Sequence, residues 1–106
     1  MIGIDILSVK RFKKIFNKKF VERIFSVREI SYCKNKKNSI LHFAVRFAAK
    51  EAVIKALKDK NLNLRDIEIL NKGDGSPYVV VKGREGKVHI SLSHENDFVV
   101  AVCIKS

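Results

Sequence analysis

The chain has 106 residues, of which 46% are hydrophobic, and a formal net charge of +11. This length predicts one domain over residues 1–106, and the hydrophobic content excludes a disordered chain because it is enough to fill a core. No apolar run approaches the roughly 20 residues that span a bilayer. The first residues lack the basic leader of a signal peptide, so a cytoplasmic protein is expected.

The positive charge is concentrated in the first part of the chain. Residues 1–60 contain 16 Lys or Arg and five Asp or Glu, whereas residues 61–106 contain six of each, so the first part supplies the whole excess of 11. Such a field attracts a polyanion, which could be a nucleic acid, a phosphorylated ligand, an acidic protein or an anionic membrane. The charge alone does not choose among these partners.

The chain opens with a predicted strand and a predicted basic helix. Isoleucines alternate with Gly3 and Asp5 over residues 2–7, which predicts a strand whose Asp5 side chain leaves the face opposite the isoleucines. Ser8 is a suitable N-cap for a helix that runs to about residue 17. Its inner face is apolar, and its outer faces carry lysine and arginine with no acid among them.

Two further helices are predicted before the spacing of apolar residues changes from the helical period to the alternation of strands. Ser26 and Glu29 have the spacing of a capping box, which predicts a short helix toward Lys34. Apolar residues at three-to-four spacing then predict a long helix, with Ser39 as its cap and its end near residues 59–61.

The final third of the chain predicts strands. Alternating β-branched runs separated by turn residues cover residues 67–70, 78–82, 88–93 and 98–104. The last run is apolar on both faces, as expected of an interior strand, and residues 94–97 are predicted to be the turn before it. The element order predicts an α+β fold, with helices packed on a mainly antiparallel sheet.

The segment from Arg46 to Ala56 carries the most chemical information in the long helix. Glu51 falls on the core-facing side, and Lys55 follows one turn later. Burying a carboxylate is unfavourable unless it is paired, protonated or bound to a cation. The simpler interpretation is a surface pair of Glu51 and Lys55, worth about 0.2–0.5 kcal/mol. The segment alone does not separate the two interpretations.

The remaining residue types suit a divalent metal and phosphates better than a covalent nucleophile. Asp5 and Glu51 offer hard oxygen ligands of the kind that Mg²⁺ takes together with waters and substrate phosphates. Cys33 and Cys103 match no metal-ligand or redox spacing, so no function is assigned to them. No phosphate-binding GxxxxGK[ST] segment occurs.

Three segments follow one another at the spacing of known family signatures. They are Gly3-Ile4-Asp5 with Arg11, the run from Phe43 to Ala56, and Gly75-Ser76-Pro77 followed by the run from Ile90 to His94. Together they resemble the short bacterial holo-acyl-carrier-protein synthases, members of the 4′-phosphopantetheinyl transferase superfamily. The resemblance covers nearly the full length, and it implies the fold of that superfamily.

The resemblance implies a Mg²⁺-dependent transferase of fatty acid biosynthesis. Such an enzyme moves 4′-phosphopantetheine from its co-substrate coenzyme A to a serine of apo-acyl carrier protein, and releases adenosine 3′,5′-bisphosphate. Asp5 and Glu51 match the metal ligands, and with Lys55 they form the implied catalytic residues. The group that deprotonates the serine stays open between Glu29 and a metal-bound water.

The resemblance also implies the binding surfaces. The implied coenzyme A site consists of Arg46, Lys55, Pro77, Ser93 and His94. The implied contacts to the acidic carrier protein are Lys10, Arg11 and Lys14. A homotrimer is implied, in which a neighbouring subunit completes each active site. Where the family has a Gly-rich turn after the central helix, this chain has residues 57–61 instead.

The main alternative is a small basic nucleic-acid-binding protein, which the positive charge favours. Against it, the strands lack the paired exposed aromatic residues of an RNA-binding sheet, and no helix-turn-helix or zinc-finger spacing occurs. The acids Asp5 and Glu51 also have no role in phosphate binding without a metal. We therefore expect the transferase, with no nucleic acid or membrane as partner.

Overall fold

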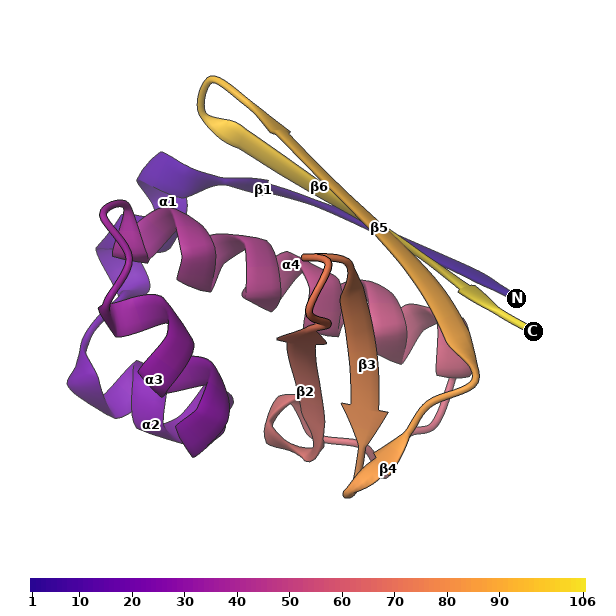
Figure 1. The fold of residues 1–106 in the computed structure, drawn as a ribbon. Helices are drawn as coiled ribbons and strands as arrows, with labels where there is room; N and C mark the ends of the chain where they lie inside the picture. The colour runs from indigo at the N-terminus through magenta and orange to yellow at the C-terminus, as the bar shows by residue number, and fades with distance from the viewer.

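A long helix, α4, lies beneath a three-stranded sheet in the computed structural model, which describes residues 1–106 (Figure 1). Three shorter helices gather near the beginning of α4, and a second small sheet lies on its other side in this view. In chain order the elements are β1 (Ile2–Ser8), α1 (Val9–Ile15), α2 (Lys18–Ile24), α3 (Val27–Lys34), α4 (Ser39–Leu57), a 3₁₀ turn (Leu64–Asp66), β2 (Ile67–Asn71), β3 (Pro77–Val81), β4 (Arg84–Glu85), β5 (Val88–Glu95) and β6 (Phe98–Lys105).

Both sheets are antiparallel, which confirms the predicted α+β fold. The first sheet has the strand order β1-β6-β5, so β6 is the interior strand that its two apolar faces predicted. The second has the order β2-β3-β4. The sequence predicted neither the division into two sheets nor the two-residue strand β4, because strand partners far apart in the chain are chosen by packing.

The predicted helix over residues 8–17 is shorter in the structure and is followed by a separate helix. α1 ends at Ile15, Phe16 is extended, and Asn17 caps α2 by accepting a hydrogen bond from the amide of Phe20 at 2.9 Å. An asparagine at this position favours a new helix start over a continued helix. The capping box of α3 is present as predicted, with both reciprocal hydrogen bonds formed.

The ends of α4 differ from the prediction. Its N-cap is Asn38, which makes no side-chain capping bond, rather than Ser39. The helix ends at Leu57, and Lys58 adopts a left-handed conformation with φ of 54°. Charged side chains interrupt α4 throughout, and no helix of the structure combines the length and apolarity needed to cross a bilayer.

Aromatic side chains attach the short helices to α4. Ring centroids lie 5.0–6.4 Å apart in a chain of contacts made by Phe12, Phe16, Phe20, Phe25, Phe43 and Phe47. Tilted and edge-on pairs at these distances add to the stabilisation from burial. The cluster therefore fixes α1 and α2 relative to the helix that carries Glu51.

The first strand packs directly on the backbone of α4. A Cβ atom at Gly3 would lie 1.9 Å from the carbonyl oxygen of Ala52 and 2.7 Å from the amide nitrogen of Ala56. Only glycine permits this approach, and the two alanines that face it are fully buried. The contact determines which residues along α4 the next residues of β1 meet.

The substitution Gly3→Ala is expected to lower the free energy of unfolding by about 1–3 kcal/mol, because β1 must move away from α4 to admit the methyl group. Thermal unfolding followed by circular dichroism measures the effect, with Tm falling by about 4–8 °C per kcal/mol. Gly73→Ala is the matched control, since a Cβ at Gly73 would meet no atom within 4 Å. An equal Tm for both variants would contradict the close approach.

Candidate active site

Two acids and a lysine meet where β1 crosses α4. Lys55 Nζ lies 3.2 Å from Asp5 Oδ1 and donates a second hydrogen bond to the carbonyl oxygen of Ile4 at 2.9 Å. The Asp5 side chain is 17% exposed and that of Lys55 is 52% exposed, so the pair is open to solvent on one side. Lys55 thus pairs across to β1, and the simple surface pair with Glu51 is not formed.

Glu51 lies half-buried beside this pair. Burial raises its pKa, the negative charge of Asp5 raises it further, and the charge of Lys55 opposes both effects. Two carboxylates that disfavour each other's charge are relieved by a cation between them. No third Asp, Glu, His or Cys joins them. The pair therefore suits Mg²⁺, which is commonly held by one or two carboxylates, with waters and substrate phosphates completing its shell.

A separate cavity of about 680 Å³ opens between α4, the second sheet and β5. Arg46 is one of the residues that line it and is only 4% exposed. Its guanidinium stacks on the ring of Tyr32 at 4.2 Å, and Nη2 donates to Asn71 Oδ1 at 2.5 Å. These contacts fix the plane of the guanidinium, which matches phosphate oxygens in a bidentate geometry.

One nitrogen of this guanidinium has no partner. Arg46 Nε is buried and makes no hydrogen bond, while Nη1 donates only a long bond of 3.4 Å to the carbonyl oxygen of His42. A buried donor without an acceptor is unfavourable by about 1–3 kcal/mol. The arrangement therefore favours an anionic ligand that brings oxygen atoms to Arg46.

Two histidines lie on the walls of the same cavity. The pKa of His42 is lowered by burial first, and then by the positive charges of Arg46, Lys36 and His94. His94, predicted to be in a turn, belongs to β5, which continues to Glu95. The cavity is thus basic through its arginine, and it contains a half-buried histidine that resists protonation in the absence of a ligand.

The structure places most of the predicted coenzyme A residues around this cavity. Arg46, Pro77 and His94 line it, together with Ser91. Ser93 does not line it and is exposed to solvent. Lys55 is also absent from its lining and lies with Asp5 instead.

The sequence-based prediction missed Tyr32, His42 and Asn71, which all line the cavity. Asn71 is 25 residues from Arg46 in the chain, and it belongs to no recognisable sequence motif. Tyr32 and His42 have the spacing of ordinary helix residues. Only the contact with Arg46 distinguishes these residues from polar surface positions.

The acid pair and the basic cavity lie on opposite sides of α4. Arg46 and Lys55 are nine residues apart, which on an α-helix is a rotation of about 180° and a rise of about 13.5 Å. Asp5 lies on β1 at one edge of the first sheet, and His94 lies on β5 at the other edge. A single chain therefore does not gather the predicted residues into one site.

The predicted docking residues lie on the surface of α1. Lys10, Arg11 and Lys14 are all exposed, and none of them forms an ion pair. Uncompensated charges of one sign repel each other, so a negatively charged partner would be attracted to this helix.

A buried ion pair excludes one candidate base. Glu29 Oε1 lies 2.6 Å from Lys50 Nζ, and both side chains are fully buried. Lys50 also donates to the carbonyl oxygens of Ile24 and Leu64, and Glu29 Oε2 accepts from the amide of Ile69. Burial lowers the pKa of Lys50, while the charge of Glu29 acts against that shift. Because Glu29 is committed to this pair, it cannot accept a proton from a substrate.

Comparison with known proteins agrees with this geometry. The family model described as the 4′-phosphopantetheinyl transferase superfamily matches residues 1–103. The chain belongs to this superfamily. The resemblance seen in the sequence is thereby confirmed, and with it the prediction of an enzyme rather than a nucleic-acid-binding protein.

Similar proteins cover the whole chain. A holo-[acyl-carrier-protein] synthase of Thermodesulfovibrio yellowstonii is 48% identical over 107 residues, which cover 97% of this chain and 95% of the relative. The crystal structure of the Helicobacter pylori synthase in complex with coenzyme A superposes with a TM-score of 0.84 at 37% identity, and covers 100% of both chains. The Bacillus anthracis synthase, solved in complex with CoA (3′,5′-ADP), gives a TM-score of 0.84 at 37% identity, and covers 96% of this chain and 91% of that one.

The substitution Lys50→Met is expected to destabilise the fold by about 3–5 kcal/mol, because it leaves Glu29 charged and buried without its partner. The double variant Lys50→Met/Glu29→Gln should recover part of this loss. Urea unfolding of the wild type, Lys50→Met, Glu29→Gln and the double variant measures the coupling energy between Lys50 and Glu29. If the losses of unfolding free energy in the two single variants add up to the loss in the double variant, the ion pair contributes nothing to stability.

Proposed function

We propose that the protein transfers the 4′-phosphopantetheine group from coenzyme A to a serine of apo-acyl carrier protein, releasing adenosine 3′,5′-bisphosphate. The observation that carries the proposal is the presence of an acid–lysine cluster and a basic cavity in one chain whose residues 1–103 match the superfamily. Relatives named as holo-[acyl-carrier-protein] synthases, two of them solved with coenzyme A, support it. Residues 1–106 would act as one transferase domain in the cytoplasm.

The carboxylates of Asp5 and Glu51 would hold Mg²⁺. The charge of Asp5 raises the pKa of Glu51, and both side chains are half-buried, which supports this assignment. When bound, Mg²⁺ would neutralise oxygens of the pyrophosphate and make its phosphorus easier to attack. Since two carboxylates provide few ligands, we expect the protein alone to bind the ion weakly and coenzyme A to strengthen binding.

Lys55 would stabilise the charge that moves during transfer. In the reaction the serine hydroxyl gives its proton to a base, its oxygen forms a bond to the phosphorus next to pantetheine, and the bond from that phosphorus to the oxygen of the adenosine 5′-phosphate breaks. Negative charge then increases on the leaving phosphate. Lys55 Nζ, 3.2 Å from Asp5, is half exposed and can turn toward this oxygen.

The cavity around Arg46 would hold the nucleotide end of coenzyme A. Its guanidinium has a free Nε, and Tyr32 and Asn71 set its plane. His94 would contact phosphate oxygens, and Pro77 would line the adenosine. Phosphoryl transfer depends mainly on such positioning and on electrostatic stabilisation, which explains the lack of a covalent nucleophile.

We further propose a homotrimer in which two subunits share each site. The outer face of the first sheet is apolar. Its exposed apolar residues, each 46–68% accessible to solvent, are Ile2, Ile4, Ile6, Phe98 and Ile104. The register places these side chains next to one another across β1 and β6. A contiguous apolar face of this kind on a protein surface marks an interface. Packing of subunits through it would bring the acid pair of one toward the cavity of another.

The exposed basic residues Lys10, Arg11 and Lys14 of α1 would receive the acidic carrier protein. The absence of an ion pair to any of their side chains supports this role. Complementary charge raises the association rate and makes it sensitive to ionic strength.

Incubation of apo-acyl carrier protein with the protein, coenzyme A and Mg²⁺ should add the mass of one phosphopantetheine group, as measured by mass spectrometry. EDTA should abolish the gain, and Asp5→Asn or Glu51→Gln should reduce transfer at least 100-fold, as expected for loss of a metal that stabilises the reacting charge. Glu85→Gln, which removes an exposed acid of β4, is the control. No gain with several carrier proteins, together with salt-sensitive binding of RNA or DNA, would favour the nucleic-acid alternative.

Subunit sharing is tested by mixing two inactive variants, Glu51→Gln and Arg46→Ala, under conditions that exchange subunits. In a ring with shared sites, roughly a quarter of the sites would combine an intact acid pair with an intact cavity, because each half is intact with a probability of one half. Transfer should therefore return on mixing. Sedimentation equilibrium gives the subunit number. An active monomer, or variants that stay inactive after proven exchange, would contradict the shared site.

A further inference from the structure

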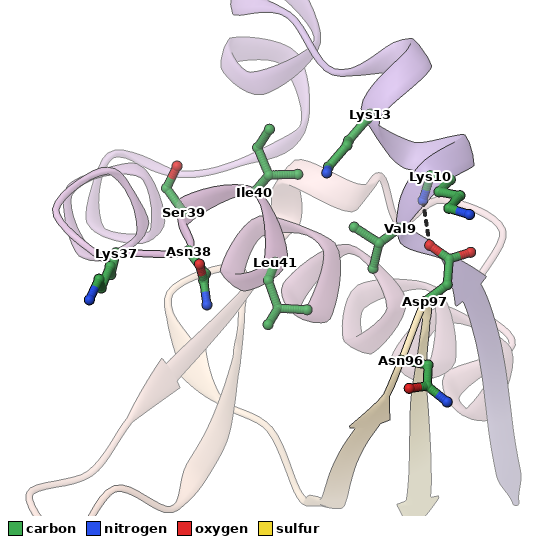
Figure 2. Close-up of a pocket in the computed structure, with 10 residues that line it drawn as sticks. All are labelled: Val9, Lys10, Lys13, Lys37, Asn38, Ser39, Ile40, Leu41, Asn96 and Asp97. Carbon is green, nitrogen blue, oxygen red and sulfur yellow. Dashed lines mark hydrogen bonds between the residues drawn. The ribbon is translucent and has the colours of Figure 1, made fainter.

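The turn between β5 and β6 makes an unexpected contact with the start of α1. Asp97, at this turn, accepts hydrogen bonds from the Ser8 hydroxyl at 2.5 Å and from the Lys10 amide at 2.9 Å through its two carboxylate oxygens. Its backbone oxygen accepts a third from the amide of Val9 at 2.8 Å. Figure 2 shows Asp97 directly beneath the first turn of α1, with the bond to Lys10 drawn as a dashed line.

The first turn of α1 needs an outside partner for its amide groups. The helix has seven residues and no acid in its first turn, where Lys10 and Arg11 place positive charge at the positive end of the helix dipole. Helices this short are marginal without tertiary contacts. Ser8 supplies one capping bond, a long one of 3.3 Å to the amide of Arg11. Asp97 supplies both a negative charge and the remaining acceptors.

The later part of α1 has its own anchor. Phe12 is fully buried, and its ring lies 5.5–5.7 Å from the rings of three other phenylalanines. The first turn has only Val9, half-buried against the core, because Lys10 and Arg11 are exposed. The hydrogen bond from Ser8 lowers the pKa of Asp97, so the carboxylate is charged at neutral pH.

We propose that Asp97 is a positioning residue that holds the first turn of α1, and with it Lys10 and Arg11, in the orientation that receives the carrier protein. This inference rests on the proposed function, since it assigns α1 to carrier docking. Asp97 itself would touch neither substrate. It would act through the backbone of α1, from a hairpin that also carries His94 at the nucleotide cavity.

Positioning and simple electrostatics predict opposite results when Asp97 is removed. Loss of a negative charge beside lysines makes the surface more basic, so electrostatics alone would lower the KM for an acidic carrier protein. Loss of the cap frees the first turn and lowers the fraction of molecules in the docking orientation, so positioning would raise this KM. A merely structural role would lower the concentration of folded enzyme and hence kcat, with both KM values unchanged.

The test measures kcat and both KM values for the wild type, Asp97→Ala and Asp97→Asn. For Asp97→Ala the KM for apo-acyl carrier protein should rise about three- to tenfold, with kcat and the KM for coenzyme A unchanged. Asp97→Asn keeps one acceptor oxygen and should give a smaller rise. Asp66→Asn is the matched control, because Asp66 also accepts a backbone amide, that of Asn63, at the start of a 3₁₀ turn. A lower or unchanged KM for the carrier protein would overturn the proposal.

Two further measurements separate this proposal from the proposed function. Reversing Lys10, Arg11 and Lys14 to Glu gives the KM expected when docking is lost, and wild-type transfer shows whether the reaction occurs at all. Amide hydrogen exchange, which needs no substrate, should show faster exchange at Lys10 and Arg11 in Asp97→Ala than in Asp66→Asn. Unchanged exchange at these amides would overturn the positioning role even if transfer is found.

Discussion

The functional geometry depends on the contact between the backbones of β1 and α4. Gly3 lies against the carbonyl of Ala52 and the amide of Ala56, at a distance that excludes any side chain. Side chains two residues apart on a strand share a face, so Asp5 also faces α4, where it meets Lys55 next to Glu51. A shift of the strand by one residue would place an isoleucine against α4 and turn Asp5 to the outer face. The close approach thus selects the register that assembles the acid pair.

The rest of the core prevents α4 from rotating away from this register. On one side Lys50 is bound to Glu29 of α3 and to two carbonyl oxygens, and on another Arg46 is enclosed by Tyr32 and Asn71. Buried charges are tolerated only where such partners are in place, so these contacts specify one orientation of the helix. The same orientation separates the acid pair from the basic cavity by about half a turn. In the proposed homotrimer each chain would then present two incomplete halves, and the apolar outer face of the first sheet would join them.

The third constraint concerns α1, whose charge the core does not compensate. Its basic residues remain exposed and form no ion pair, while Asp97 holds its first turn and Phe12 anchors its middle. A short helix of like charges would fray if it were held by its own hydrogen bonds alone. The hairpin of β5 and β6 therefore has two roles in the fold, since β5 lines the cavity around Arg46 and the turn after it caps α1.

The sequence by itself determined most of the elements, the class of fold and the residues of the acid cluster. Alternation over residues 2–7 and the capping box of Ser26 and Glu29 depend on neighbours within a few positions, so local pattern was sufficient for them. The tertiary structure alone decided that the fully buried charged residue of α4 is Lys50 rather than Glu51. The reason is that helices and both sheets cover α4 on several faces, whereas the sequence pattern assumed one buried face. It also decided the partners of Arg46 and Asp97, which are 25 and up to 89 residues away. Contacts at such separations leave no periodic trace in the chain, since they are chosen by how whole elements pack.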